Sequence, residues 1–359
     1  MGRRCVGSAS REARLARRGG GRRGFVKIIV LVVNRLIWFV PTLLGLLAIV
    51  FFISHIIPAD PAAFAAGENA SAATIAEMRQ RLGLDQPIHI QFLRYVQSIL
   101  SGDMGRSIYT GRPVSEDLLS RLPATLELTF VTVIIATLIG VPLGVVSALR
   151  RNTWVDHGLR FVTIAGLAIA SFWFAILLQL LFSMRLGVTP LTGRVDGWGP
   201  EPITGFYVID SLINRDMATL VDALHHMTLP VATLALPAAA TIVRFTRAGV
   251  LNALESNYVL YETAMGYPRR QIVWKYVLRN ALIGTVTQIG LIFGILLAGA
   301  VVVEAVFDWP GLGMFAVNSI LNSDYNAVMG FTLIAGTMFI LVNLAVDILQ
   351  GLIDPRETR

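Results

Sequence analysis

ATLELTFVTVIIATLIGVPLGVVSAL, residues 124–149, decides the fold class of this chain. A helix needs about 20 consecutive, predominantly apolar residues to cross the hydrocarbon core of a bilayer. This stretch exceeds that length and contains a single charged residue, Glu127. Its proline and glycines are tolerated in membrane helices, where they bend the helix or let two backbones approach. The stretch therefore predicts a membrane-spanning helix.

Five further apolar runs of similar length occur along the 359 residues. They cover roughly 31–57, 161–184, 229–250, 283–306 and 327–351. The composition agrees, since 55% of the residues are hydrophobic and only 15% are charged, fewer than a soluble domain carries. A membrane β-barrel would show short alternating segments instead. We therefore predict an all-α, polytopic (multi-pass) membrane protein with six transmembrane helices.

The charge distribution predicts the topology. Residues 1–35 hold ten basic side chains and one acidic side chain, Glu12. Cytoplasmic loops carry an excess of Lys and Arg, so the N-terminus is expected inside the cell. Six spans then return the C-terminus to the same side, and the basic stretches 150–152 and 262–282 fall inside too. Because the positive charge follows the membrane, we expect contact with lipid and no nucleic-acid partner.

Four regions are expected along the chain. A basic tail without regular structure covers 1–24, and a short cytoplasmic tail covers 354–359. Residues 25–122 form the first span and a small extracytoplasmic helical cap, in which two amphipathic helices flank the turn at 85–87. Residues 123–353 form a core of five helices. The single cysteine, Cys5, allows no intrachain disulfide.

Catalytic chemistry is not indicated. The two lysines, Lys27 and Lys275, lack the Gly-Lys-Ser/Thr context of a phosphate-binding loop, so any ATP and Mg²⁺ would bind to partner subunits. His225 and His226 have only Asp222 nearby, and a polar loop end before the fourth span is favoured over a metal site. We therefore predict no cofactor, no metal and no catalytic residue in this chain.

Four polar residues lie within or beside the expected spans, where such residues are costly and often functional. They are Glu127, Glu304, Asn343 and Asp347. Two interpretations remain open. The residues line a translocation path, or they form hydrogen bonds between packed helices, and the second is favoured.

ETAMGYPRRQIVWKYVLRNAL, residues 262–282, interrupts the apolar pattern between the fourth and fifth spans. The stretch 258–265 is predicted to be a helix, with Gly266 as a left-handed cap and Pro268 in the first turn of the next helix. Apolar residues then recur at helical spacing on one face. Such a segment either lies on the lipid surface or docks into a groove of a cytoplasmic partner, and the pattern alone does not decide.

Several motifs point to a known family. Tyr258-Val259, Ala264, Gly266 and LRNAL (278–282) resemble the cytoplasmic loop of binding-protein-dependent ABC transporter permeases of the dipeptide/oligopeptide/nickel type. Glu262-Thr263, Met265 and Gly284 depart from that pattern. The motifs LPATLELT (122–129), DMGRSI (103–108), FDWPGLG (307–313), NSDYNAVMG (322–330) and VNLAVDILQGLIDPR (342–356) extend the resemblance over roughly 28–357.

The resemblance implies the type I ABC importer permease fold and a heteromeric importer in a prokaryotic cytoplasmic membrane. This chain would be the first-type permease, beside a second homologous permease, two cytoplasmic ATP-binding subunits and an extracytoplasmic substrate-binding protein. Di- or oligopeptides are the expected substrates; relatives also handle nickel chelates, glutathione and oligosaccharides. The alternative is a stand-alone secondary transporter or channel.

The resemblance also implies a coupling loop at about 253–282 that meets the ATPase subunit. Its expected contact residues are Tyr258, Glu262, Ala264, Gly266, Tyr267, Pro268, Arg269, Arg279 and Asn280.

Overall fold

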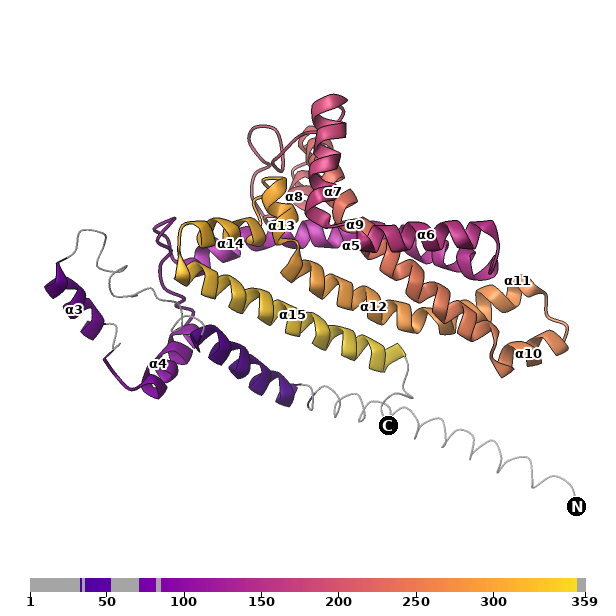
Figure 1. Cartoon of the computed structure of the whole chain (residues 1–359), viewed down its shortest axis with the longest axis horizontal. Coiled ribbons are helices and arrows are strands. Elements are labelled where there is room, and N and C mark those ends of the chain that lie inside the picture. The colour runs from indigo at the N-terminus through magenta and orange to yellow at the C-terminus, as the bar shows by residue number, and fades with distance from the viewer. Residues whose placement is uncertain (1–32, 34–35, 53–70, 82–84, 354–359) are drawn as a thin grey trace, which may run out of the picture.

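The computed structural model describes residue 33 and residues 36–52, 71–81 and 85–353 (Figure 1). Within these residues the regular structure is helical, apart from an isolated β-bridge between Arg106 and Pro113. The expected tails at 1–24 and 354–359 lie outside the described residues.

In chain order, the described elements are a helix at Leu36–Phe52, α3 (Ala72–Arg81), α4 (Ile88–Leu100), α5 (Val114–Leu149), α6 (Trp154–Ala168), α7 (Ser171–Leu178), the π-helical η1 (Gln179–Arg185), α8 (Tyr207–Ile213), α9 (Met217–Leu254), α10 (Asn257–Ala264), α11 (Arg269–Gln271), the π-helical η2 (Ile272–Val277), α12 (Leu278–Gly299), α13 (Val301–Val306), α14 (Leu312–Leu321) and α15 (Tyr325–Ile353).

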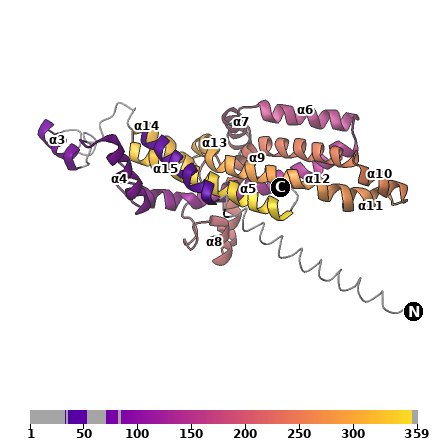
Figure 2. The ribbon, with the colours of Figure 1, turned by 90° about the horizontal axis from the view of Figure 1, so that it is seen from below.

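Four helical segments of the described chain are long and apolar enough to cross a membrane. They are Val114–Leu149, Met217–Leu254, Arg269–Gly299 and Tyr325–Gln350. They run roughly along the long axis of the molecule, with α10 and α11 at one end and α3 and α4 at the other (Figures 1 and 2). These segments correspond to the second, fourth, fifth and sixth predicted spans. Of the first predicted span, the structure describes the apolar helix Leu36–Phe52.

The third predicted span, 161–184, is not one straight helix. The chain bends by 100° between α6 and the α7–η1 segment. Ile169 and Ala170 adopt extended backbone angles at the break. The break residues are neither proline nor glycine, and the nearest glycine, Gly166, lies within α6. Packing favours the bend, because Ala175 and Leu178 of α7 are buried in the main apolar core. Figure 1 shows α7 turned away from the direction of α6. The described residues therefore give four spans, or five if the bent pair counts as one.

Close packing of α5 on α9 builds the centre of the bundle. Gly140 and Gly144 lie one turn apart on α5 and face Ile242 and Thr246 of α9. A methyl group added at Gly144 would lie 2.6 Å from the β-carbon of Thr246, and one at Gly140 would lie 2.7 Å from Ile242. Small residues at this spacing let two membrane helices approach closely.

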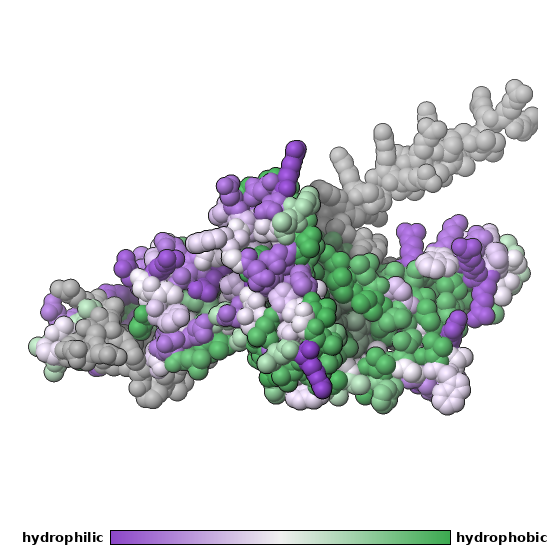
Figure 3. Space-filling view, turned by 90° about the horizontal axis from the view of Figure 1, so that it is seen from above, coloured by the Kyte–Doolittle hydropathy of each residue, from purple (hydrophilic) through white to green (hydrophobic). Residues whose placement is uncertain are grey.

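The surface shows how such a molecule meets a bilayer. Figure 3 shows a broad hydrophobic area over the helices, with hydrophilic side chains gathered toward the ends and over the 186–206 loop region. At one end, α4 packs on the Leu36–Phe52 helix, because Phe92 and Tyr95 place their rings 5.4 and 5.7 Å from the ring of Phe51.

Candidate functional site

The 253–282 segment is a helical hairpin with a complete glycine cap. α10 ends at Ala264 with Met265 as its C-cap residue, and Gly266 follows with φ of +79°. The amide of Gly266 donates to the carbonyl of Thr263, and the amide of Tyr267 donates to the carbonyl of Glu262. This pair of bonds is the Schellman arrangement, which satisfies the last carbonyls of a helix. Nothing lies within 4 Å of a β-carbon at Gly266, so its backbone angle, not crowding, requires glycine.

The second arm of the hairpin is amphipathic, as predicted. Pro268 is the residue before α11 rather than part of its first turn, a shift of one position. Its ψ of 140° is extended, so the helix starts at Arg269. Ile272 and Val277 are buried in an apolar cluster with Val145 of α5 and Val250 of α9. This cluster anchors the hairpin to the ends of the two central helices.

The opposite face of the hairpin is exposed and carries large apolar side chains. Leu260, Tyr261, Met265 and Trp274 are 72, 62, 61 and 65% exposed. A shallow groove on the second arm is lined by Pro268, Arg270, Gln271, Trp274 and Lys275. Exposed apolar side chains beside cationic ones favour contact with a protein partner or with lipid headgroups.

The predicted contact residues lie on this hairpin and at the start of α12. Ala264, Gly266, Tyr267, Pro268, Arg269, Arg279 and Asn280 are exposed, whereas Tyr258 and Glu262 are half-buried. The hairpin therefore offers most of them to a partner. Their role in coupling stays a prediction.

A buried ion-pair cluster around Asp156, which the sequence did not reveal, lies close to the hairpin. Asp156 of α6 is fully buried and accepts two hydrogen bonds from Arg247 of α9, at 2.8 and 3.0 Å. Ser147 donates to the same carboxylate at 2.6 Å, and Arg160 lies 3.2 Å away. These bonds join α5, α6 and α9 at the end that carries the hairpin. The signal available in the sequence was only an Asp and an Arg four residues apart in α6.

Glu127 takes part in a second buried cluster, about a third of the way along α5. Its carboxylate pairs with Arg194 and accepts the amide of Val208 at 2.7 Å. Glu127 is 4% exposed and Arg194 is 7% exposed. The guanidinium also donates to the carbonyl of Gly205 at 3.0 Å and lies 3.7 Å from the ring centre of Tyr207. The cluster thus holds the 186–206 loop and α8 against α5.

Asp210 of α8 holds the adjacent part of the loop, residues 203–205, by hydrogen bonds. The carboxylate accepts the amides of Ile203, Thr204 and Gly205, and the hydroxyl of Thr204. Burial alone would raise the pKa of Asp210, but these donors outweigh it and hold the pKa below its usual range.

Glu304 of α13 is another buried carboxylate surrounded by hydrogen-bond donors. It accepts the hydroxyl of Thr125 at 2.7 Å and the amides of Gly313 and Met314 at 2.7 and 3.2 Å. The carboxylate is fully buried among these donors. Glu304 therefore joins α5 to the start of α14, which fits the helix-packing interpretation of this residue.

Asn343 and Asp347 are half-buried on α15, well beyond its first turns. Glu127 lies on α5 and Glu304 on α13, so the four residues come from three different helices. Whether any of the four lines a translocation path stays a prediction.

Four of the motifs that carried the family resemblance contact one another in two pairs. Trp309 of FDWPGLG donates to the carbonyl of Ala124 in LPATLELT at 3.0 Å. Asp324 of NSDYNAVMG accepts the hydroxyl of Ser107 in DMGRSI at 2.5 Å, and Asn326 donates to the carbonyl of Arg106. Segments about 185 to 220 residues apart in sequence are thereby fixed side by side.

Comparison with known proteins gives the family. A family model described as "Binding-protein-dependent transport system inner membrane component" matches residues 140–359. A companion model for the N-terminal part of such membrane components matches residues 28–129.

Curated relatives agree with these matches. The probable D,D-dipeptide transport system permease protein of Escherichia coli K12 is 45% identical over 317 residues, covering 88% of this chain and 93% of the relative. A dipeptide transport system permease of Alkalihalophilus pseudofirmus is 37% identical, and a glutathione transport system permease of Salmonella paratyphi A is 39% identical. Each covers 90% of this chain and 97% of the relative.

Among solved structures, the MetNI methionine ABC transporter gives a TM-score of 0.47 at 19% identity, covering 64% of this chain and 93% of that one. The family models together match most of the chain, and the relatives align over nearly their full lengths. This chain therefore belongs to the family of binding-protein-dependent transport system inner membrane components, the permease subunits of ABC importers.

Proposed function

We propose that this permease subunit imports di- and oligopeptides, as the first-type member of a pair of different permeases. The proposal is supported by the relatives named for D,D-dipeptide, dipeptide and glutathione transport, since glutathione is itself a small peptide. Family membership removes the support for a stand-alone secondary transporter or channel. The chain itself performs no bond chemistry in this scheme.

The hairpin at 253–282 is the proposed docking surface for a cytoplasmic ATP-binding subunit. The observation that carries this proposal is that the hairpin has one buried face and one exposed face. One face is anchored by Ile272 and Val277 to α5 and α9, and the other presents Leu260 and Trp274 to the surroundings. A surface of this kind transmits movement, because a push on the exposed face moves the helices to which the buried face is fixed.

The rest of the proposed assembly is supported by membership of this family. ATP and Mg²⁺ bind to the partner subunits, and the hairpin and both chain termini face the cytoplasm. The substrate-binding protein docks on the opposite side, where α3 and α4 lie. Substrate then passes between this chain and the second permease as the helices alternate between two arrangements.

Charge substitutions on the hairpin test the docking proposal. Leu260→Asp combined with Trp274→Asp should abolish co-purification of the ATP-binding subunit from membranes that express the whole transporter. Both side chains are exposed, so insertion and thermal stability should not change. Leu93→Asp, at an exposed position of α4 on the other end of the molecule, is the matched control and should retain the subunit. Equal retention by all the variants would show that the ATPase docks elsewhere.

Competition in reconstituted vesicles tests the substrate class. Uptake of a labelled dipeptide, driven by ATP on the hairpin side, should be inhibited by unlabelled di- and tripeptides. A nickel chelate and an oligosaccharide should not compete. Peptide uptake in the absence of ATP and of the ATP-binding subunit would instead support a stand-alone transporter.

A further inference from the structure

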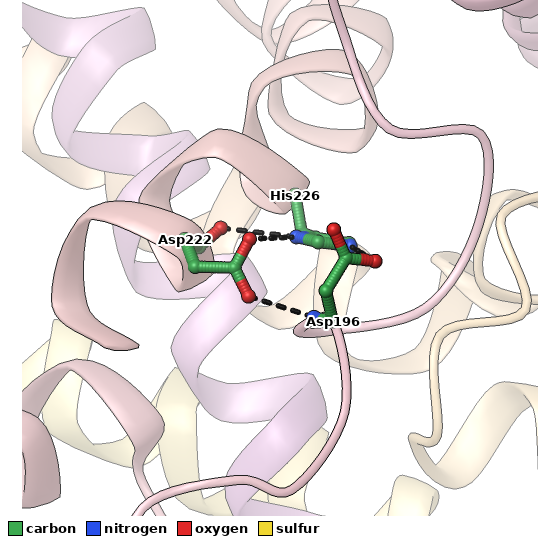
Figure 4. A group of neighbouring side chains, drawn as sticks. All are labelled: Asp196, Asp222 and His226. Carbon is green, nitrogen blue, oxygen red and sulfur yellow. Dashed lines mark hydrogen bonds and ion pairs between the residues drawn. The ribbon is translucent and has the colours of Figure 1, made fainter. Parts of the chain in front are cut away.

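Asp196, Asp222 and His226 form a cluster that the transport mechanism does not use. Asp222 and His226 lie four residues apart in the first turns of α9, whereas the 253–282 hairpin follows the other end of this helix. Asp196 comes from the 186–206 loop, and its backbone amide donates to a carboxylate oxygen of Asp222 at 2.7 Å. The three side chains offer ligand atoms within 4.8 Å of one another (Figure 4).

The hydrogen bonds of His226 assign its tautomer. Its Nδ1 lies 3.0 Å from the carbonyl oxygen of Asp222 and 3.2 Å from a carboxylate oxygen of the same residue. Both atoms are acceptors, so Nδ1 carries a proton, and in the neutral ring Nε2 then presents a lone pair. His226 is 95% buried, and its Nε2 has no hydrogen-bond partner among the described residues. A buried ring nitrogen without a hydrogen-bond partner is a position at which a metal ion can bind.

The separation of Nε2 from the carboxylate of Asp196 indicates which cation. The two atoms are 3.5 Å apart. A charge-assisted hydrogen bond between a protonated imidazole and a carboxylate would be about 2.7–2.9 Å long. Two ligands of a tetrahedral zinc ion, each bonded at about 2.0–2.1 Å, lie about 3.3–3.4 Å from each other. The observed distance is therefore close to that between two metal ligands.

We propose that Nε2 of His226 and the carboxylate of Asp196 bind a divalent transition-metal ion, with zinc as its probe. Asp222 acts as the positioning residue, because one of its oxygens holds Nδ1 of His226 and the other holds the amide of Asp196. A carboxylate behind a metal-binding imidazole fixes the ring and increases its basicity. The imidazole ligand favours zinc and similar ions over Ca²⁺ and Mg²⁺, which prefer oxygen.

The remaining coordination positions are open to water or to a group of a partner, since the side chain of Asp196 is 89% exposed. The ion would also fasten the 186–206 loop to α9. Asp196 is two residues from Arg194, which inserts beside Glu127, so metal binding would stabilise the loop where it carries that buried pair.

Calorimetric titration of the purified, chelator-treated full chain with Zn²⁺ tests the site. A Cys5→Ser background removes the single thiol. We expect one Zn²⁺ per chain in the wild type, no binding in Asp196→Asn or His226→Gln, and affinity reduced about 10–100-fold in Asp222→Asn. His225→Gln, whose ring lies 2.8 Å from the carbonyl of Val188, is the matched control and should bind as the wild type does.

A second measurement does not depend on the His226 variant, whose folding the change of a buried side chain could disturb. Zn²⁺ should slow hydrogen exchange in 186–206 of the wild type and leave the exchange unchanged in Asp196→Asn, whose side chain lies at the surface. Ca²⁺ and Mg²⁺ should have no such effect. Absence of stoichiometric zinc binding by the wild type, or undiminished binding by Asp196→Asn, would overturn the proposal.

Discussion

Two buried ion pairs in this permease join distant parts of the chain. Glu127 pairs with Arg194, 67 residues away, and Asp156 pairs with Arg247, 91 residues away. The sequence identified Glu127 as unusual because a carboxylate in an apolar run is costly. It could not identify Arg194, because a Gly-rich loop gives no periodic signal and the pairing is set by the tertiary fold.

Removing one member of the Glu127–Arg194 pair should destabilise the protein strongly. Glu127→Gln leaves the guanidinium of Arg194 buried without a counter-charge, and the loss of one partner from a buried pair costs about 3–5 kcal/mol. The melting temperature in detergent should fall clearly. Glu116→Gln, at an exposed position of the same helix, should leave it unchanged. The double variant Glu127→Gln/Arg194→Gln should lose less than the sum of the single changes, and strict additivity would show that the pair is not coupled.

The sequence predicts where the long helices lie better than it predicts where they bend or which helices pack together. The apolar runs located α5, α9, α12 and α15 because a membrane helix must satisfy its own backbone hydrogen bonds over a fixed thickness. The bend between α6 and α7 was missed, since the residues at the break, Ile169 and Ala170, are ordinary in a helix. The approach of α5 to α9 was only hinted at by Gly140 and Gly144, as the sequence does not say which helix they face.

A single methyl group should be enough to disturb the α5–α9 contact. In Gly144→Ala the new β-carbon would lie 2.6 Å from Thr246 and 2.9 Å from the carbonyl of Val243, so the two helices must separate. Overpacking of this kind costs about 1–3 kcal/mol. Gly158→Ala on α6 makes the same change in open space and should be neutral or slightly stabilising. Thermal unfolding of both variants in detergent measures the difference, and equal melting temperatures would contradict close packing at Gly144.

On the scale of the whole molecule, α5 and α9 connect the hairpin to the 186–206 loop. The hairpin is fixed to α5 and α9 by Val277 and its neighbours, and the Glu127–Arg194 cluster fixes the 186–206 loop to α5. The hairpin was predictable from the sequence because glycine caps and amphipathic spacing are local signals. The connection through Glu127 and Arg194 was not predictable, because it depends on contacts between distant segments. In the proposed coupling scheme, α5 and α9 would carry movement of the hairpin to the loop.

We expect coupling through the hairpin to require the left-handed backbone angle at Gly266. Valine is strained at a φ of +79°, at a cost of about 1–3 kcal/mol, so Gly266→Val should change the angle between α10 and α11. The assembled transporter should still insert, bind its ATPase and hydrolyse ATP, but uptake per ATP hydrolysed should fall severalfold. Gly284→Val, at an exposed α12 position with open space and an ordinary helical backbone, should transport as the wild type does. Unchanged uptake per ATP in Gly266→Val vesicles would refute a coupling role for the hairpin, whereas loss of assembly would assign Gly266 to docking instead.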